Sequence, residues 1–425
     1  MGIQMTTVII GGGITGLSAG YHMDDDIIIL ERDNATLGGL CSSYRIEEEC
    51  NYYIEKFYHH LFEQDYELIS LCRKLGIKIE WRIGTVGYSF GNKIYPLNTL
   101  HEILKYPYLT FFEKLKLAQF TLKCKREDPQ KHVRKTATDY IIKNVGVPTY
   151  EKFFLPLLKG KFGEDYLDIS AAWLISRIKL RSNRTSKGER LGYIKGGFQK
   201  VVDALANKIE RKGGKILRGT NVREIVVKNG IVKSVKTENE TIKADKVICT
   251  SPGLTAKHFG MKKLLFQGAF CTLFSLKKKI SDIYWLNIGD NLSFKALIEH
   301  TNFIPFEDYG ENLVYAVTYT SKPIDIEKTL KLFRSDLEKF GIGEEDILWQ
   351  RTSYEMFTTP LYSRSYTYLP YTSDVKGLYF AGIFSKPNYP ERSINGSIKA
   401  GKEVAELISN WGAPLKVDTK LRNKK

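Results

Sequence analysis

A glycine-rich turn near the start of the chain constrains the fold more than any other feature. The β-branched run Thr6–Ile10 predicts a strand, and apolar residues recur at helical spacing directly after the turn. Gly11, Gly13 and Gly16 form the pattern G-x-G-x-x-G between them. The first glycine permits the turn, the second lets backbone approach a diphosphate, and the third lets helix and strand pack closely. The spacing therefore predicts a strand–turn–helix unit that binds a dinucleotide at a helix N-terminus.

A carboxylate follows where such a unit needs one. A second strand is expected over residues 27–30, and it ends in Glu31, about 20 residues after the first glycine. The carboxylate would accept hydrogen bonds from ribose hydroxyls, a contact that a 2′-phosphate would repel. We count Ile14 and Thr15 of the helix and Arg32 beside the acid among the expected contacts. The alternative is a glycine-rich turn with an acid that follows it by chance. It explains the strand, the glycine spacing and the position of the acid less well than a dinucleotide-binding unit does.

Composition excludes several other classes of protein. The chain has 425 residues and a net charge of +16, which is enough for two or three domains with cores of their own. Its six cysteines form no C-x-x-C pair and have no histidine at metal-ligand spacing, so we expect no metal site and a reducing, cytoplasmic setting. No run of roughly 18 apolar residues predicts a spanning helix. The basic charge is spread, which makes nucleic acid an unlikely partner and leaves an anionic substrate or a membrane surface open.

A second glycine pair carries a resemblance to a known family. Gly38, Gly39 and Leu40 follow the ribose acid, and this stretch resembles the flavin-dependent amine oxidase superfamily, which includes monoamine oxidases, protoporphyrinogen oxidases and phytoene desaturases. The resemblance implies that the pair packs under the diphosphate of FAD. Leu40 stands where an arginine often follows, so no cationic role is carried to it. The G-G-L variant is similar to protoporphyrinogen oxidase-like and UDP-galactopyranose mutase-like members.

Two later segments extend the resemblance. Residues 193–252 resemble the family's returning segment, in which the residue matching Val222 meets adenine with its backbone. Residues 377–398 resemble the closing segment, in which a helix N-terminus faces the flavin ring. There Gly382 matches, as do Ser393, Ile394 and Asn395, while Ile383 replaces the expected aspartate. No cysteine follows Cys271, so the thioether link of some amine oxidases is unavailable in that segment and FAD is expected to be non-covalent.

Candidate catalytic groups are few. His60 aligns with a family histidine near the flavin and would titrate near neutrality beside the ring, although a structural role is equally consistent with its place. For the neighbouring His59 a structural role is favoured. Glu299 and His300 are adjacent, so in a strand at most one faces the flavin, and His300 is the candidate for acid–base work. No catalytic triad and no metalloprotease motif is visible.

The dispersed motifs predict two interleaved domains. The fold class is α/β, with a Rossmann-type FAD-binding domain that contains a parallel sheet, and a mixed α+β substrate domain inserted into it. The FAD-binding domain is expected to comprise residues 1–80, 191–260 and 371–412. The substrate domain is expected to have a helical part at 81–190 and a sheet part at 261–370, with a basic tail at 413–425. Residues 104–125 mix aromatic residues with lysines, and core packing is favoured over contact with a membrane.

The resemblance implies an FAD-dependent oxidoreductase that removes hydride from a C–N or C–C bond of a small organic substrate. The alternative is a redox-neutral flavoenzyme that acts on a nucleotide sugar, similar to UDP-galactopyranose mutase. A third hypothesis is that the protein is a non-enzymatic FAD-binding scaffold at a membrane surface.

Overall fold

A computed structural model describes most of the chain. The described residues are 5–24, 26–47, 51–91, 93–181, 184–185, 187–260 and 264–410. The expected basic tail at 413–425 lies outside them, as does one of the six cysteines, Cys50. Within these ranges no helix is both long and apolar enough to cross a membrane.

A five-stranded parallel sheet joins the beginning, middle and end of the chain. Its strand order is β10-β2-β1-β14-β20, and every neighbouring pair is parallel. The strands are β1 (Thr6–Ile10), β2 (Asp26–Leu30), β10 (Lys215–Leu217), β14 (Lys246–Cys249) and β20 (Leu378–Phe380). The predicted α/β class with a parallel sheet is confirmed. The expected domain boundaries stay predictions.

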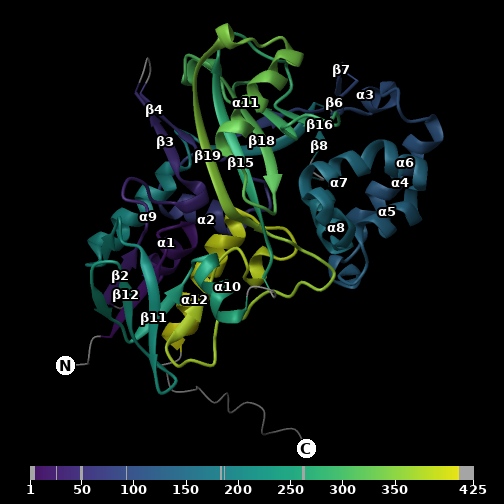
Figure 1. Cartoon of the computed structure of the whole chain (residues 1–425). Coiled ribbons are helices and arrows are strands. Elements are labelled where there is room, and N and C mark those ends of the chain that lie inside the picture. The colour runs from purple at the N-terminus through teal and green to yellow at the C-terminus, as the bar shows by residue number, and fades with distance from the viewer. Residues whose placement is uncertain are drawn as a thin grey trace, which may run out of the picture.

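Alternation along the strands buries both faces of this sheet. Ile9 and Ile29 lie on one face, in the core that contains α1, α9 and α12, whereas Val8 and Ile10 lie on the other, against β11, β12 and α10. The helices are α1 (Ile14–Tyr21), α9 (Gln199–Arg211), α10 (Pro252–Phe259) and α12 (Ile394–Asn410). A small antiparallel sheet covers the second face, with strands β11 (Val222–Lys228), β12 (Ile231–Thr237) and β13 (Thr241–Lys243). Figure 1 shows these layers at the lower left.

A seven-stranded mixed sheet stands above the parallel one (Figure 1). In sheet order its strands are β19 (Ile347–Pro360), β15 (Phe266–Leu276), β18 (Asn312–Thr320), β17 (Ala296–Glu299), β16 (Trp285–Ile288), β6 (Val86–Phe90) and β7 (Lys93–Pro96). One face packs on α11 (Ile326–Leu337), where the ring centroids of Phe270 and Phe333 are 5.3 Å apart. The other face contributes Trp285 and Tyr315 to the main core, and Tyr284, just before β16, joins them there.

Helices of the first inserted segment form a separate group with its own core. They are α3 (Leu100–Lys105), α4 (Phe111–Arg126), α5 (Ala137–Val145), α6 (Val147–Thr149), α7 (Leu155–Phe162) and α8 (Ala171–Leu180), with a π-helical turn at Tyr150–Phe154. The other described elements are α2 (Tyr66–Lys74) and the strands β3 (Ser43–Ile46), β4 (Tyr52–Glu55), β5 (Ile79–Gly84), β8 (Arg184–Thr185) and β9 (Gly188–Ile194).

The stretch 104–125 differs from the expectation of a packed core segment. The stretch is divided between the end of α3 and nearly the whole of α4. Pro107 lies in the connection between the two helices, and Thr110 caps the N-terminus of α4 in a capping box with Glu113. Tyr106 and Phe120 are buried, but Phe111 and other large apolar side chains of α4 are exposed. Core packing therefore accounts for only part of this segment.

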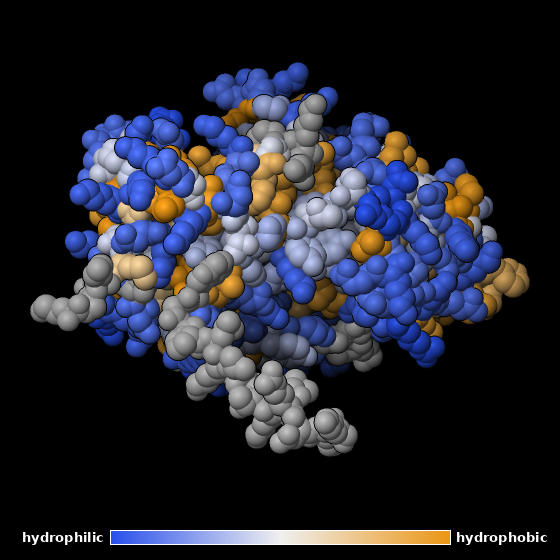
Figure 2. Space-filling view, turned by 90° about the horizontal axis from the view of Figure 1, so that it is seen from below, coloured by the Kyte–Doolittle hydropathy of each residue, from blue (hydrophilic) through white to orange (hydrophobic). Residues whose placement is uncertain are grey.

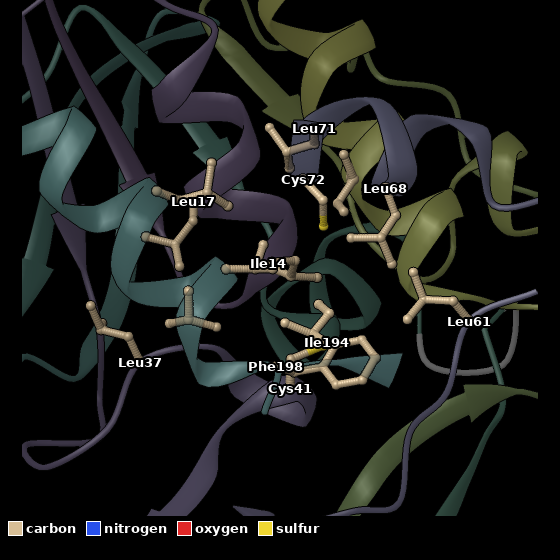
Figure 3. Packing of buried hydrophobic residues seen from close by; sticks show 14 of the residues in the cluster. Ile14, Leu17, Leu37, Cys41, Leu61, Leu68, Leu71, Cys72, Ile194 and Phe198 are labelled. Atoms are coloured by element: carbon tan, nitrogen blue, oxygen red, sulfur yellow. The ribbon is translucent and has the colours of Figure 1, made fainter. Parts of the chain in front are cut away.

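Leu17 of α1 gives a test of the main core. It is fully buried in the cluster of Figure 3, with Ile14 from the same helix and Leu68 and Leu71 from α2. Leu17→Ala should lower the free energy of unfolding by about 2–5 kcal/mol, because it removes buried methyl groups and leaves a cavity. The urea midpoint measures this loss. Leu348→Ala, at a side chain that is 53% exposed, should leave the midpoint almost unchanged. Equal midpoints for the two variants would contradict the packing.

Candidate functional site

A cavity of about 680 Å³ opens at the carboxyl edge of the parallel sheet. Ile10, Leu30 and Thr250 line it where β1, β2 and β14 end. Thirteen of the residues predicted to bind the cofactor line the same cavity. They are Gly11, Gly13, Ile14, Thr15, Glu31, Arg32, Gly38, Gly39, Leu40, Val222, Gly382, Ser393 and Ile394. Segments from three distant parts of the sequence thus meet at one place, although the contacts of these residues with a cofactor stay predictions.

The first glycine turn leaves a helix N-terminus open to the cavity. Gly13 precedes α1 without any side-chain cap, and the first turn of the helix contains no acid. The N–H groups at the start of such a helix lack partners within it and favour a negative charge. Gly16 lies behind the cavity lining, where a Cβ atom would come within 2.0 Å of the Gly11 carbonyl oxygen. Only glycine lets α1 approach the turn this closely.

The second glycine turn packs directly on the first. The amide of Gly38 donates to the Gly12 carbonyl at 2.9 Å, and Gly38 and Gly13 form a parallel bridge. Gly38 has a φ of +107°, which a residue with a side chain rarely adopts. The two turns meet backbone to backbone, so glycine backbone instead of side chains forms this wall of the cavity.

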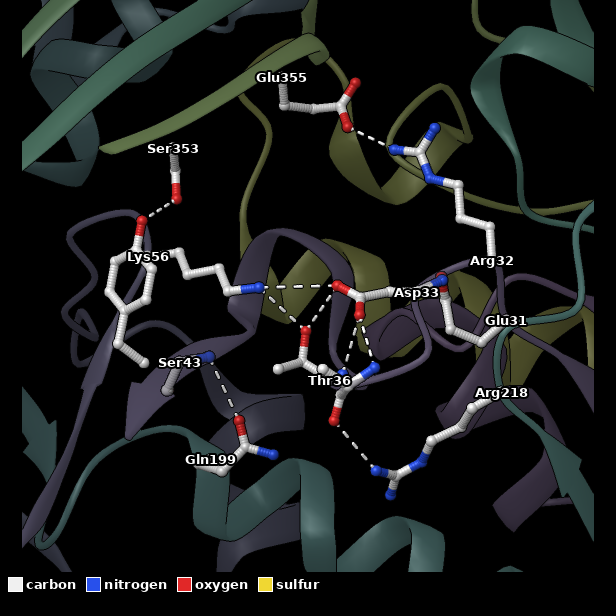
Figure 4. A network of polar contacts seen from close by, with 12 residues as sticks. Glu31, Arg32, Asp33, Thr36, Ser43, Lys56, Gln199, Arg218, Ser353 and Glu355 are labelled. Atoms are coloured by element: carbon white, nitrogen blue, oxygen red, sulfur yellow. Dashed lines mark hydrogen bonds and ion pairs between the residues drawn. The ribbon is translucent and has the colours of Figure 1, made fainter. Parts of the chain in front are cut away.

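Carboxylates gather at one end of the cavity. Glu31 is buried, with one oxygen accepting from the Gly12 amide at 2.7 Å and the other from the Asp33 amide at 2.9 Å. Arg32 reaches across to Glu355 of β19 at 2.7 Å, and Lys56 lies 3.6 Å from Asp33 (Figure 4). Each carboxylate oxygen retains a lone pair for a further donor. This end matches the acceptor that a ribose needs.

The closing segment supplies apolar and cationic groups instead of a carboxylate. Ile383 lines the cavity where the family has aspartate, and the described acids lining the cavity all belong to the end just described. Arg392 also lines it, with Nε donating to the Thr359 hydroxyl at 2.8 Å. Asn395 is not part of the lining. Its Oδ1 accepts from the amides of Glu67 and Leu68 and so ties α12 to the start of α2.

His59, and not His60, lines the cavity. The Nδ1 atom of His59 is buried without a hydrogen-bond partner among the described protein atoms. Burial, followed by the charge of Arg392, lowers the pKa of His59 to about 3. The Nδ1 atom of His60 pairs with the Tyr284 hydroxyl at 2.9 Å, and burial followed by Arg181 holds its pKa well below the ordinary value. Burial thus disfavours the charged form of both imidazoles, whereas the sequence predicted that His60 titrates near neutrality.

His300 also lies outside the cavity lining. Strand β17 ends at Glu299, so strand alternation does not separate the two side chains, and both are buried. The Nε2 atom of His300 pairs with the Tyr309 hydroxyl at 2.8 Å, and burial lowers its pKa to about 3. Glu299 accepts from the Ser281 hydroxyl at 2.6 Å. These contacts fix His300 within the protein core, away from the cavity. Its acid–base role stays a prediction that the geometry does not support.

A group of cations adjoins the cavity beside Arg392. We call Lys161, Arg177, Arg181 and Arg392 the cationic cluster. The Nζ atom of Lys161 lies 4.2 Å from the centre of the Tyr319 ring, and the Tyr319 hydroxyl is 2.5 Å from that of Tyr58. Arg177 pairs with Glu391 at 2.8 Å, while the guanidinium of Arg181 lies over the Trp285 ring. Tyrosine hydroxyls and cations thus gather next to the cavity.

Sequence reasoning missed this cluster, although signals for it were present. Arg177 and Arg181 belong to the basic stretch 177–190, whose charge alone predicts a solvated face as readily as a binding site. Lys161 lies in a segment, residues 150–163, that resembles the family's substrate side. Arg392 lies within the closing segment, directly before Ser393.

Together, the parallel sheet, the paired glycine turns and the acid beyond β2 are the features of a dinucleotide-binding fold. The chain belongs to the flavin containing amine oxidoreductase family, whose sequence profile matches residues 14–409. It is therefore a flavin-dependent oxidoreductase, as the sequence predicted.

Solved structures share this fold. A candidate protoporphyrinogen oxidase from Exiguobacterium sp. 255-15 is 18% identical, with a TM-score of 0.74 over 96% of this chain and 99% of that one. A reduced UDP-galactopyranose mutase is 14% identical, with a TM-score of 0.71 over 96% of each chain. Cyclohexylamine oxidase from Brevibacterium oxydans IH-35A is 15% identical, with a TM-score of 0.66 over 96% of this chain and 99% of that one. A search of curated protein sequences found no match.

Gly16 provides a test of the glycine turn. In Gly16→Ala the new methyl group would collide with the Gly11 carbonyl, a strain of roughly 1–3 kcal/mol that moves α1 away from the cavity. The purified variant should retain clearly less flavin than the unaltered protein, as measured by absorbance per mole of protein. Gly160→Ala is the matched control, because its methyl group would make only ordinary contacts with Lys295. Full flavin retention by Gly16→Ala would refute the close approach.

Proposed function

We propose that the chain binds FAD non-covalently in the cavity and oxidises a small organic substrate at a C–N or C–C bond. The observation that carries the proposal is the contact of the two glycine turns beneath an uncapped helix in a family of flavoproteins. Bound FAD would supply a two-electron acceptor that the side chains themselves lack. The residues of this chain would bind it, orient it and exclude water.

Each end of the cavity fits one part of the cofactor. The first turn of α1 would hold the diphosphate, and Glu31 would accept the ribose hydroxyls. Backbone at Val222 would meet the adenine. The N-terminal residues of α12, from Ser393, would face the ring, where the helix dipole favours negative charge. The unpartnered Nδ1 atom of His59 would gain a hydrogen-bond partner from the cofactor.

Non-covalent binding is supported by the chemistry of Cys41. It lines the cavity, but burial raises the pKa of its thiol to about 12. A protonated thiol is a poor nucleophile, so Cys41 is unsuited to form a thioether with the cofactor.

Anaerobic titration tests the proposed reaction. Purified protein should show a flavin absorption band, and denaturation should release FAD into the supernatant. We expect an amine, a porphyrinogen or a polyene to bleach the band without oxygen, and air to restore it. Protein without the band, and with no uptake of added FAD, would refute the cofactor. A normal band that no substrate of these three classes bleaches would refute the oxidase reaction alone.

The cationic cluster favours a second candidate, a redox-neutral reaction on a nucleotide sugar. Four cations and two tyrosine hydroxyls beside the cavity would suit a diphosphate, whose charge guanidinium groups bind well. The shared fold with a UDP-galactopyranose mutase is compatible with this candidate. Isomerisation of a nucleotide sugar after reduction with dithionite, in protein that no oxidase substrate bleaches, would favour it over oxidation.

Lys161 makes anion binding at the cluster depend on pH. Burial, followed by the charge of Arg177, lowers the pKa of Lys161 to about 7. Its ammonium form attracts an anion and is lost as the pH rises, so the affinity for UDP should be highest below pH 7 and fall above it. The flavin absorbance change on UDP titration measures this dependence. Lys161→Met should remove it, whereas Lys159→Met, at an exposed lysine of the same helix, should keep it. A UDP affinity independent of pH in the unaltered protein would contradict a role of Lys161.

A further inference from the structure

The helices α3 and α4 expose an unusual number of large apolar side chains. Phe111 is 65% exposed and Phe112 74%, although phenylalanine is among the residues most often buried in proteins. We call the set of exposed apolar side chains on the two helices the α3–α4 face. It consists of Leu100, Leu104, Phe111, Phe112, Leu115 and Leu122. Figure 1 shows the two helices at the outer edge of the helical group, and Figure 2 shows apolar residues among hydrophilic ones at that end of the molecule.

Helix α4 is apolar on two opposite sides. Phe120 and Cys124 are buried in the core of the helical group. Phe111, Leu115 and Leu122 stand four and eleven residues apart, which is about one and three turns, so they share the side that points away from that core. Packing within the chain explains the first side only. The second side is covered by nothing in the described part of the chain.

Cations border the α3–α4 face. Lys114 and Lys125 lie along one edge of the exposed side of α4, with Lys116 and Lys123 along the other, as their helical spacing requires. The acids of the two helices are both engaged. Glu102 caps α3, and Glu113 caps α4 and binds Lys152 at 3.0 Å. A carboxylate oxygen of Glu127 lies 3.9 Å from the Nζ atom of Lys123, so this border lysine has an acid beside it. A shallow groove continues the face along α4, lined by Gln119, Leu122, Lys123, Arg126 and Glu127.

We propose that the α3–α4 face docks on the surface of an anionic lipid bilayer. Its phenylalanine and leucine side chains enter the boundary between headgroups and acyl chains, and the lysines along both edges bind lipid phosphates. This geometry is that of a helix lying in the plane of the interface. The basic border argues against a second copy of the chain, because two such faces would bring like charges together.

Vesicle sedimentation tests the docking. The flavin-loaded, full-length protein should sediment with vesicles of phosphatidylcholine and phosphatidylserine, much less with phosphatidylcholine alone, and less as salt increases. Phe111→Ser/Phe112→Ser/Leu115→Ser should weaken binding by roughly tenfold or more, because it removes the apolar anchor. Lys114→Gln/Lys116→Gln should weaken binding to the anionic vesicles by about fivefold per lysine.

The controls separate docking from misfolding. Leu332→Ser/Leu348→Ser replaces exposed apolar residues of α11 and β19 and should bind as the unaltered protein does. Flavin content and far-UV circular dichroism should be the same in all variants. Failure of the unaltered protein to bind anionic vesicles would overturn the proposal. A dimer in solution that dissociates in the Phe111→Ser/Phe112→Ser/Leu115→Ser variant would also overturn it, in favour of self-association.

Discussion

The amide of Gly38 donates to the carbonyl of Gly12, and this contact holds two glycine turns against each other with no side chain between them. The turn at Gly11 can pack against α1 only because Gly16 has no side chain, so that the helix comes within contact distance of the Gly11 carbonyl. The second turn then places the chain leading to β3 over the helix N-terminus. Glycine backbone thus forms one wall of the cavity, and the remaining walls are arranged around it.

Local features of this arrangement could be predicted from the sequence. Strand β1, the turn and α1 are contiguous in the sequence. Each glycine is required sterically at its position, and the spacing of the glycines indicates this requirement. Glu31 could be predicted for the same reason, because strand β2 is short and its end is marked by the acid. Val222 and Gly382 required the family resemblance, since their motifs are specific only when joined to the first.

Other residues depend on packing that no local pattern encodes. Whether His59 or His60 reaches the cavity is decided by the partner that each finds, and Tyr284, which binds His60, directly precedes β16, more than two hundred residues away. Asn395 matches the closing motif and nevertheless turns to cap α2. The second apolar side of α4 resembles a core pattern in sequence, because periodicity gives the spacing of apolar residues but not what covers them.

The parallel sheet has a consequence for how the chain is made. Strand β1 pairs with β14, and β14 pairs with β20, so these neighbours in the sheet are separated by long stretches of the chain. During synthesis the apolar strands β1 and β2 leave the ribosome long before β14 and β20 exist to cover their edge. Closing such distant pairs costs loop entropy before contacts repay it. The cavity can therefore be completed only late in synthesis, after β14 and β20 have been made.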